Sequence, residues 1–406
     1  MQSENMSQIS LAYLKTLCQT IPERCVGSEG NRQATRFFAD QLTRLGWQTE
    51  AQPFEALDWE EAGASLQAGD QIFSVFVSPY SLGCEVRAPL IGVSRLSELE
   101  TADLRGKIVL LYGDIAKEQL MPKNFVFYNP EEHQRIVALL ERGMPQALVC
   151  ATGRNAAVAG GVYPFPLIED GDFDIPSVYM TEEEGKRLLQ YVGQTVVLVS
   201  KSRRIPATGE NILGRKGNNP ERRIVMTAHI DAKKGSPGAI DNATGVVVLL
   251  LVAQLLQDYS GDPTLELVAF NGEDYYAASG QMVYIQHIQG RFSEIALNIN
   301  IDGAGYKEGK SAFSFFNLPV ELERKAHRLL TKLPGITQGA QWIQGDHSIF
   351  IQYGVPAIAI SSQWFLDHLD SQEITHTPKD NIEIVDPHKL VEIAVALQSF
   401  LTEAEK

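Results

Sequence analysis

TAHIDAKKGSPGAIDNATG, residues 227–245, is the stretch that decides the fold. It follows a short apolar run, residues 224–228, that is typical of a buried strand. It leads into an apolar segment, residues 245–256, which we expect to be a helix with Asn242 or Thr244 placed to cap its N-terminus. A strand, a polar loop and a helix in this order are typical of an α/β sheet.

The polar loop carries side chains that bind metals. His229 and Asp231 are alternate residues at the end of the predicted strand, so their side chains project the same way. A second acid, Asp241, follows after turns rich in glycine and proline. Open α/β sheets keep their functional sites at the carboxyl ends of strands. One histidine and two carboxylates at such an end predict a hard or borderline metal ion such as zinc.

Composition narrows the class of protein. The chain has 406 residues, enough for two domains or for one large domain with an insertion. Its 44% hydrophobic and 21% charged residues are typical of a soluble globular enzyme. The formal charge of -15 argues against nucleic acid and anionic membranes as partners, because both select basic patches. The four cysteines are scattered without metal-ligand spacing, so isolated thiols are more common than pairs in such a pattern.

The ends and apolar runs of the chain bear on its location. Residues 1–15 lack a basic start followed by an apolar core, so no signal peptide is predicted. The longest apolar run, residues 246–253, is too short to span a bilayer. We therefore expect a soluble, cytoplasmic protein.

The second half of the chain alternates between strand and helix patterns. Strands are predicted at 224–228, 265–270, 296–301 and 357–361, and helices at 245–256, 280–288, 320–330 and 387–404. Apolar strands alternating with amphipathic helices predict an α/β fold with a mostly parallel, mixed sheet sandwiched by helices. Two N-terminal helices, residues 10–18 and 31–45, are expected to complete the helical layers.

Between these parts lies a region of different texture. Residues 52–204 contain short β-type runs separated by glycine, proline and acidic turns, with two helices. We expect it to be an inserted β-rich domain with its own small core. The predicted domains are therefore 1–51 with 206–406, and 52–205 as the insertion.

Four predicted strand ends finish in metal-binding residue types. They supply His229, Asp231 and Asp241; then Glu273 and Asp274; then Asp302; and finally His376 in a late loop. Each acid alone could be a helix cap or turn former, and a surface histidine alone is more often inert. Unrelated caps have no reason to place histidine and acid at four successive strand ends. If the ends converge, they can hold two divalent ions that share a carboxylate.

Taken together, the motifs resemble a known family. AHID, GAIDNATG, NGED, NINIDGAG, GDHSIF, GVPAIAIS and HTPKDN follow the order found in di-zinc exopeptidases of the bacterial leucyl aminopeptidase and glutamate carboxypeptidase type, peptidase clan MH. RCVGSEGNRQATRFFADQLTRLGW resembles the opening helices of that family. The resemblance implies a phosphorylase/zinc-peptidase-like fold. RGKIVLL and IPSVYMTEEEGKRL resemble the protease-associated insertion of some members.

The resemblance also implies roles for the site residues. Asp241 would bridge two zinc ions, with His229 and Asp302 completing one ion and Asp274 and His376 the other. Glu273 would be the general base, and Asp231 would orient the imidazole of His229.

The chain departs from the family at two positions. Asp274 stands where the family usually has glutamate, and Thr375 stands where many members place a tyrosine that can donate to an oxyanion. Tyr275 or Tyr276 could replace that donor, although a core or surface role is at least as common. His347, beside Asp346 in GDHSIF, matches a family motif near the substrate pocket. Its side chain either contacts the substrate or makes hydrogen bonds behind the metal ligands.

The leading functional hypothesis is a zinc-dependent exopeptidase, a hydrolase that acts as an aminopeptidase on small peptides. Within enzymes, the alternative is a glutaminyl cyclase or another amide-processing activity on the same scaffold. A non-catalytic receptor is the alternative from a different class. The choice between aminopeptidase and carboxypeptidase, the preferred residue and the oligomeric state remain open from the sequence.

Overall fold

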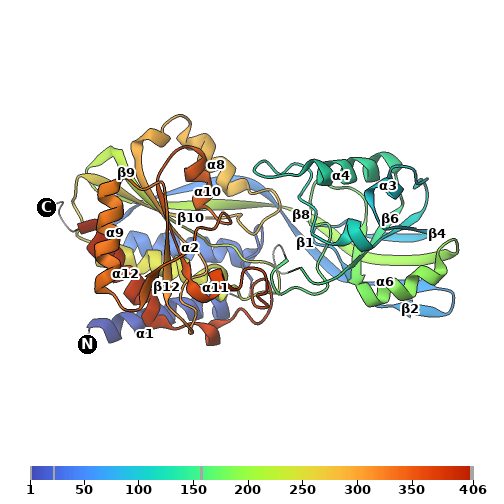
Figure 1. Cartoon of the computed structure of the whole chain (residues 1–406), viewed down its shortest axis with the longest axis horizontal. Coiled ribbons are helices and arrows are strands. Elements are labelled where there is room, and N and C mark those ends of the chain that lie inside the picture. The colour runs from blue at the N-terminus through green and yellow to red at the C-terminus, as the bar shows by residue number, and fades with distance from the viewer. Residues whose placement is uncertain (1, 22, 156–158, 403–406) are drawn as a thin grey trace. The chain divides into compact units, whose positions relative to one another are not determined.

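The computed structural model describes residues 2–21, 23–155 and 159–402, and the chain divides into two compact units (Figure 1). Unit 1 combines Met1–Ala56 with Thr208–Lys406, and unit 2 is Leu57–Ala207. The chain passes between the units within two long strands, β1 (Gln48–Ala68) and β8 (Thr195–Lys216). That the insertion is protease-associated-like stays a prediction.

Unit 1 is built on a sheet with the strand order β13-β12-β14-β11-β9-β10-β8. Besides β8, its strands are β9 (Asn219–His229), β10 (Pro263–Phe270), β11 (Ile295–Ile301), β12 (Ser311–Phe316), β13 (Ile336–Gln338) and β14 (Ala357–Ser362). The central strands β10, β9, β11 and β14 are parallel, whereas β8 and β12 pair antiparallel with their inner neighbours. The predicted mostly parallel, mixed sheet is confirmed.

The register of the parallel strands brings their carboxyl ends to one edge. Phe270 lies opposite His229, and Asn300 lies opposite Thr227. The residue two positions after Asn300, Asp302, therefore leaves its strand level with His229. The loops that follow β9, β10 and β11 all begin at this edge.

Helices cover both faces of the sheet. On one face, α1 (Gln2–Lys15), α2 (Glu29–Arg44), α7 (Thr244–Leu255) and α12 (Pro387–Thr402) share the largest hydrophobic core, with α9 (Val320–Lys332) packed beside α12. On the other face lie α8 (Ser279–Ile288) and α10 (His347–Gln352). The ring of Tyr284 in α8 contacts Phe270 of β10 edge-on, with centroids 5.0 Å apart.

The start of the first helix differs from the prediction. The sequence pattern places it at 10–18, whereas α1 begins at Gln2 and continues into a π-helical turn, Thr16–Thr20. The early residues are polar, which hides the helix in the apolar pattern, but Met6 is buried in the core and anchors the first turns.

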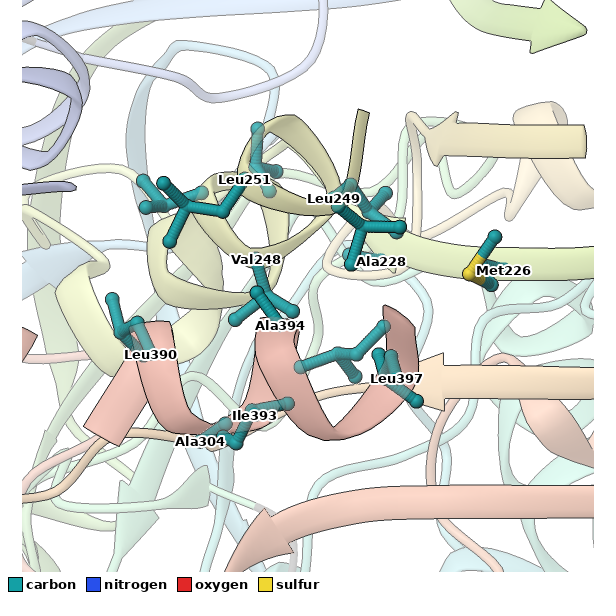
Figure 2. Close-up of a cluster of buried hydrophobic side chains, with 14 of the residues drawn as sticks. Met226, Ala228, Val248, Leu249, Leu251, Ala304, Leu390, Ile393, Ala394 and Leu397 are labelled. Atoms are coloured by element: carbon teal, nitrogen blue, oxygen red, sulfur yellow. The ribbon is translucent and has the colours of Figure 1, made fainter. Parts of the chain in front are cut away.

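The helix α7 forms the centre of the core. All its residues from Thr244 to Ala253 are buried, because the helix lies between the sheet and other helices. Figure 2 shows Val248 beside Ala394 of α12, and Leu249 on the side of Ala228 in β9. Of the two predicted caps, Asn242 is the one used: its Oδ1 accepts a hydrogen bond from the backbone N–H of Gly245 at 3.0 Å.

Unit 2 has its own sheet and its own core. Its strands run in the order β8-β4-β5-β6-β7-β3, with β3 (Phe76–Val77), β4 (Cys84–Val93), β5 (Ile108–Leu111), β6 (Ala147–Thr152) and β7 (Ser177–Thr181), while β2 (Gln71–Phe73) pairs with β1. The helices are α3 (Leu96–Leu99), α4 (Glu131–Gly143) and α6 (Glu182–Leu188). Strands β4 to β7 are parallel, so the unit is more regularly α/β than the β-rich pattern predicts.

Two expectations from composition can be compared with the structure. Cys18, Cys25, Cys84 and Cys150 are all free thiols, as predicted. Within the described residues, every helix is too short or too polar to cross a membrane.

The position of α7 makes a stability prediction. Replacing the fully buried Leu249 with alanine leaves a cavity between α7 and the sheet, and we expect it to lower the free energy of unfolding by about 2–5 kcal/mol. Val395→Ala in α12 is the control, because this side chain is exposed and its loss should cost less than about 1 kcal/mol. Urea unfolding followed by circular dichroism measures both variants. Equal effects would show that α7 is not the centre of the core.

Candidate metal centre

The predicted ligands converge at the carboxyl edge of the sheet. Asp241 lies between the two histidines, with its Oδ1 3.1 Å from His229 Nε2 and its Oδ2 3.2 Å from His376 Nε2. His229 is the last residue of β9, and His376 lies in the loop before α12. One carboxylate therefore faces both imidazoles, each with a different oxygen.

Each histidine also faces a second carboxylate. Asp302, which follows β11, places Oδ1 3.7 Å from His229 Nε2. Asp274, which follows β10, places Oδ1 3.2 Å from His376 Nε2. The five residues thus form two ligand groups of three, and Asp241 belongs to both.

The spacing of the donor atoms suits zinc. Ligands about 2.0 Å from a tetrahedral ion lie about 3.3 Å from one another, and the four nitrogen–oxygen distances are 3.1, 3.2, 3.2 and 3.7 Å. The buried Nε2 of His229 makes no hydrogen bond despite these close carboxylates, and neither does Asp274 Oδ2. Buried polar atoms are almost always satisfied, so both atoms are oriented for a ligand other than a protein hydrogen bond.

Asp231 is fixed mainly by the backbone of a neighbouring loop. Its carboxylate accepts hydrogen bonds from the backbone N–H groups of Gly272 at 2.8 Å, Glu273 at 3.3 Å and Asp274 at 3.0 Å. Its Oδ1 lies 3.7 Å from His229 Nδ1, which is longer than a hydrogen bond. Asp231 thus joins the loop after β9 to the loop after β10.

The electrostatic environment shifts the titration of the site residues. Burial raises the pKa of Glu273 well above its ordinary value, His229 opposes the rise, and Asp274 adds to it. Burial alone would lower the pKa of His229, but its contacts with Asp231, Asp241 and Asp302 raise that pKa well above the ordinary value. For His376, burial is likewise outweighed by Asp274 and Asp241, which raise its pKa.

Two supporting residues received no role from the sequence. Asp380 is fully buried and accepts hydrogen bonds from the backbone N–H groups of Ile240 at 2.7 Å and Asp241 at 3.1 Å. Burial raises the pKa of Asp380 to about 7, and the neighbouring Asp241 adds to the rise. The second is Arg24, whose buried guanidinium binds carbonyl groups of the loop after β9. Asp380 stands in the HTPKDN motif, whereas Arg24 has no local signal of this contact.

The remaining candidates surround the site without facing both histidines. His347 is fully buried, with Nε2 2.9 Å from the carbonyl oxygen of Trp342, and burial lowers its pKa. Asp346 is buried and accepts a hydrogen bond from Gln281 Nε2 at 2.9 Å. Thr375 is buried beside His376. This burial of His347 favours a supporting role over contact with substrate.

The aromatic residues of the late helix α11 (Gln363–Asp367) and of the loop after β10 pack internally. Trp364 stacks on His368 with centroids 4.3 Å apart, and Phe365 is buried in the core. Tyr275 and Tyr276 are buried with their rings 4.5 Å apart.

Known proteins resemble this chain over most of its length. Aminopeptidase YwaD of Bacillus subtilis (strain 168) is 24% identical and covers 97% of this chain and 84% of its own length. A probable leucine aminopeptidase 2 of Aspergillus oryzae is 20% identical over 90% of this chain and 66% of its own length.

Solved structures share the fold. The aminopeptidase from Aneurinibacillus sp. strain AM-1 superposes with a TM-score of 0.75 at 21% identity, covering 98% of this chain and 93% of its own. BSAP, a zinc aminopeptidase from Bacillus subtilis, superposes with a TM-score of 0.73 at 20% identity, covering 97% and 94%. Residues 211–401 match the model of peptidase family M28. The second half of the chain is therefore similar to peptidase family M28.

Proposed function

We propose that this protein is a zinc-dependent aminopeptidase that removes N-terminal residues from small peptides. The observation that carries the proposal is Asp241, which presents one oxygen to His229 and the other to His376. This arrangement can hold two zinc ions, one with His229 and Asp302 and one with His376 and Asp274. The match of residues 211–401 to family M28 and the relatives named aminopeptidases support the assignment.

The ligand set assigns a role to the metal and to Glu273. The ligand residues would hold two zinc ions, which when bound would supply Lewis acidity to a peptide carbonyl and to water, whose pKa zinc can lower to about 7. Glu273 is half-buried beside the ligands, and its pKa is raised by burial. A carboxyl group whose pKa is raised is a stronger base, and it can accept a proton from water and return it to the leaving amine. Glu273 is therefore the general base, then the general acid.

Asp231 positions this base through the backbone. The three backbone N–H groups that it binds belong to Gly272, Glu273 and Asp274, so it holds the base and one ligand together. The same carboxylate faces Nδ1 of His229, which leaves Nε2 of that ring directed at Asp241 and Asp302. One acid thus orients residues of both ligand groups.

The distances around Asp274 support its proposed role as a ligand despite the missing methylene. Its oxygen lies as far from His376 Nε2 as the Asp241 oxygen does, 3.2 Å in each case. The family departure at Asp274 is therefore compatible with a second zinc ion. Thr375 is buried, so it is not the equivalent of the tyrosine that many members place before the final histidine.

Removing the base should abolish turnover without releasing metal. We expect Glu273→Gln to lower kcat by about 10²–10⁴-fold, because proton transfer to and from the carboxylate is lost. Elemental analysis should still find two zinc ions per chain. Glu221→Gln is the control, because Glu221 is exposed near the start of β9, at the strand end opposite His229. Full activity of the Glu273→Gln protein with both metals bound would disprove the assigned mechanism.

Substrate and metal dependence can be tested together. We expect aminoacyl-anilides with a free N-terminus to be hydrolysed, the same compounds to be inert when N-acetylated, and a chelator to stop the reaction until zinc is restored. Release of residues from the C-terminus of peptides would instead identify a carboxypeptidase. Two bound zinc ions without turnover on a broad peptide panel would favour a binding role.

Metal binding should depend on pH through the histidines. Carboxylates raise the pKa of His229 and His376 in the metal-free protein, whereas zinc binds only neutral imidazole, so each ion must displace a proton. The apparent affinity for zinc should therefore fall as the pH drops below the pKa values of His229 and His376. For each imidazole that must lose a proton, the fall should be up to about tenfold for each pH unit. Competition with a chromophoric chelator at several pH values measures this slope.

A pair of variants assigns the slope to the ligands. His376→Asn should remove one displaced proton, whereas His327→Asn, on the exposed surface of α9, should leave the slope unchanged. An affinity that does not vary with pH would show that both ligand imidazoles are already neutral before metal binds.

A further inference from the structure

The segment between α1 and α2 contacts the loop that carries His229, Asp231 and Asp241. The buried guanidinium of Arg24 donates to the carbonyl oxygens of Ile230 at 2.9 Å, Pro237 at 2.8 Å and Gly238 at 2.7 Å. A side chain at Gly238 would place its Cβ 2.8 Å from Arg24 Nη2, and this residue has a positive φ of 56°. Glycine is therefore needed for Arg24 to close on the loop.

Asn31 connects this arrangement to the start of α2. The backbone carbonyl of Arg24 accepts a hydrogen bond from Asn31 Nδ2 at 2.9 Å and another from the backbone N–H of Ala232 at 3.4 Å. Ser28 caps α2 by accepting from the Asn31 backbone N–H at 3.0 Å. The helix cap thus fixes the backbone of Asn31 while its side chain points at Arg24.

The same side chain contacts the loop that carries Glu273 and Asp274. Asn31 Nδ2 also donates to Asn271 Oδ1 at 2.8 Å, and Asn271 Nδ2 donates back to Asn31 Oδ1 at 2.9 Å. Asn271 is held further by its backbone N–H, which donates to Asn211 Oδ1 at 3.0 Å. It immediately precedes Gly272, the first backbone donor to Asp231.

We propose that Asn31 is a positioning residue that sets the separation of the two ligand loops. The two hydrogens of its one planar amide bind one group each: the carbonyl oxygen of Arg24, whose guanidinium binds the loop after β9, and the side chain of Asn271, which immediately precedes residues 272–274. Asn31 and Asn271 are both fully buried, so no water can replace a lost bond without opening the core. The kinetic part of this proposal rests on the proposed function, whereas its effect on metal binding and loop protection does not.

The required accuracy explains why one amide matters. Metal–ligand distances tolerate changes of about 0.2 Å, and the ligands Asp241 and Asp274 come from the two different loops. A small change in the separation of the loops therefore changes the distance between Asp241 and Asp274, which would bind the same ion as His376. The group that contains both Asp241 and Asp274 should be the more sensitive of the two.

The decisive comparison is Asn31→Ala with Ala34→Gly. Ala34 is fully buried in the same helix α2, and glycine there weakens the helix without removing a side-chain hydrogen bond. Hydrogen exchange of the metal-free proteins should show about tenfold or greater loss of protection at residues 272–274 in Asn31→Ala only. Zinc titration with a competing chelator should show the second ion binding about 10–100-fold more weakly in Asn31→Ala only.

A double variant tests whether the effect passes through Asn271. If the two amides act as one unit, Asn31→Ala/Asn271→Ala should bind zinc no more weakly than the worse of the two single variants. The kinetic expectation is a kcat lowered by about tenfold or more with KM changed by less than about threefold. If Asn31→Ala does not fold, Asn31→Ser, which keeps one donor, replaces it in each measurement.

The outcomes separate this proposal from the proposed function. Equal loop protection and equal zinc affinity in Asn31→Ala and Ala34→Gly would overturn the positioning role. Additive losses of zinc affinity in the double variant would overturn it as well. Two tightly bound zinc ions in an otherwise inactive wild-type protein would contradict the peptidase assignment alone, because the exchange and affinity measurements need no turnover.

Discussion

The structure depends on one carboxylate that is held between two imidazoles. Around Asp241 the fold also gathers Asp274, Asp302 and Glu273, four acids in a half-buried space. Two unit charges 4 Å apart repel by about 4 kcal/mol at an effective dielectric constant of 20, so such a cluster needs positive charge among its members. The two histidines can supply it as protons, and divalent ions can supply more. Selection for a cation site explains the cluster, since folding stability alone disfavours it.

Backbone donors hold the acids that bind no metal. Asp231 accepts from three consecutive N–H groups, and Asp380 accepts from two more, one of them the N–H of Asp241 itself. A hydrogen bond to a charged group contributes about 1.5–3 kcal/mol, which offsets part of the repulsion. These bonds also run between loops, so each acid that is stabilised in this way positions a ligand at the same time.

The grouping of these side chains could be predicted from the sequence because the parallel sheet brings them together. His229 ends β9, Asp274 and Asp302 follow β10 and β11, and the register of these strands brings their ends to one edge. The full length of the strands β1 and β8 could not be predicted. In β1, buried and exposed residues alternate over only part of the strand, and the sequence contains a proline and a glycine. Arg24 and Asn31 were equally hidden, since their partners lie more than 200 residues away in the chain. Only the folded topology makes these contacts.

The charge of the site explains why the side chains of Asn31 and Asn271 are uncharged amides. An ion pair in place of this amide pair would put two charged groups near Glu273, whose pKa already responds to His229 and to several carboxylates. Asp380 shows the cost of one more acid here, because burial and the nearby Asp241 raise its pKa to about 7. The pair formed by Asn31 and Asn271 joins α2 to the loop after β10 with two neutral hydrogen bonds, and so adds no charge to the site. An amide pair is therefore the connection that fixes geometry at this position without changing the proton affinity of the base.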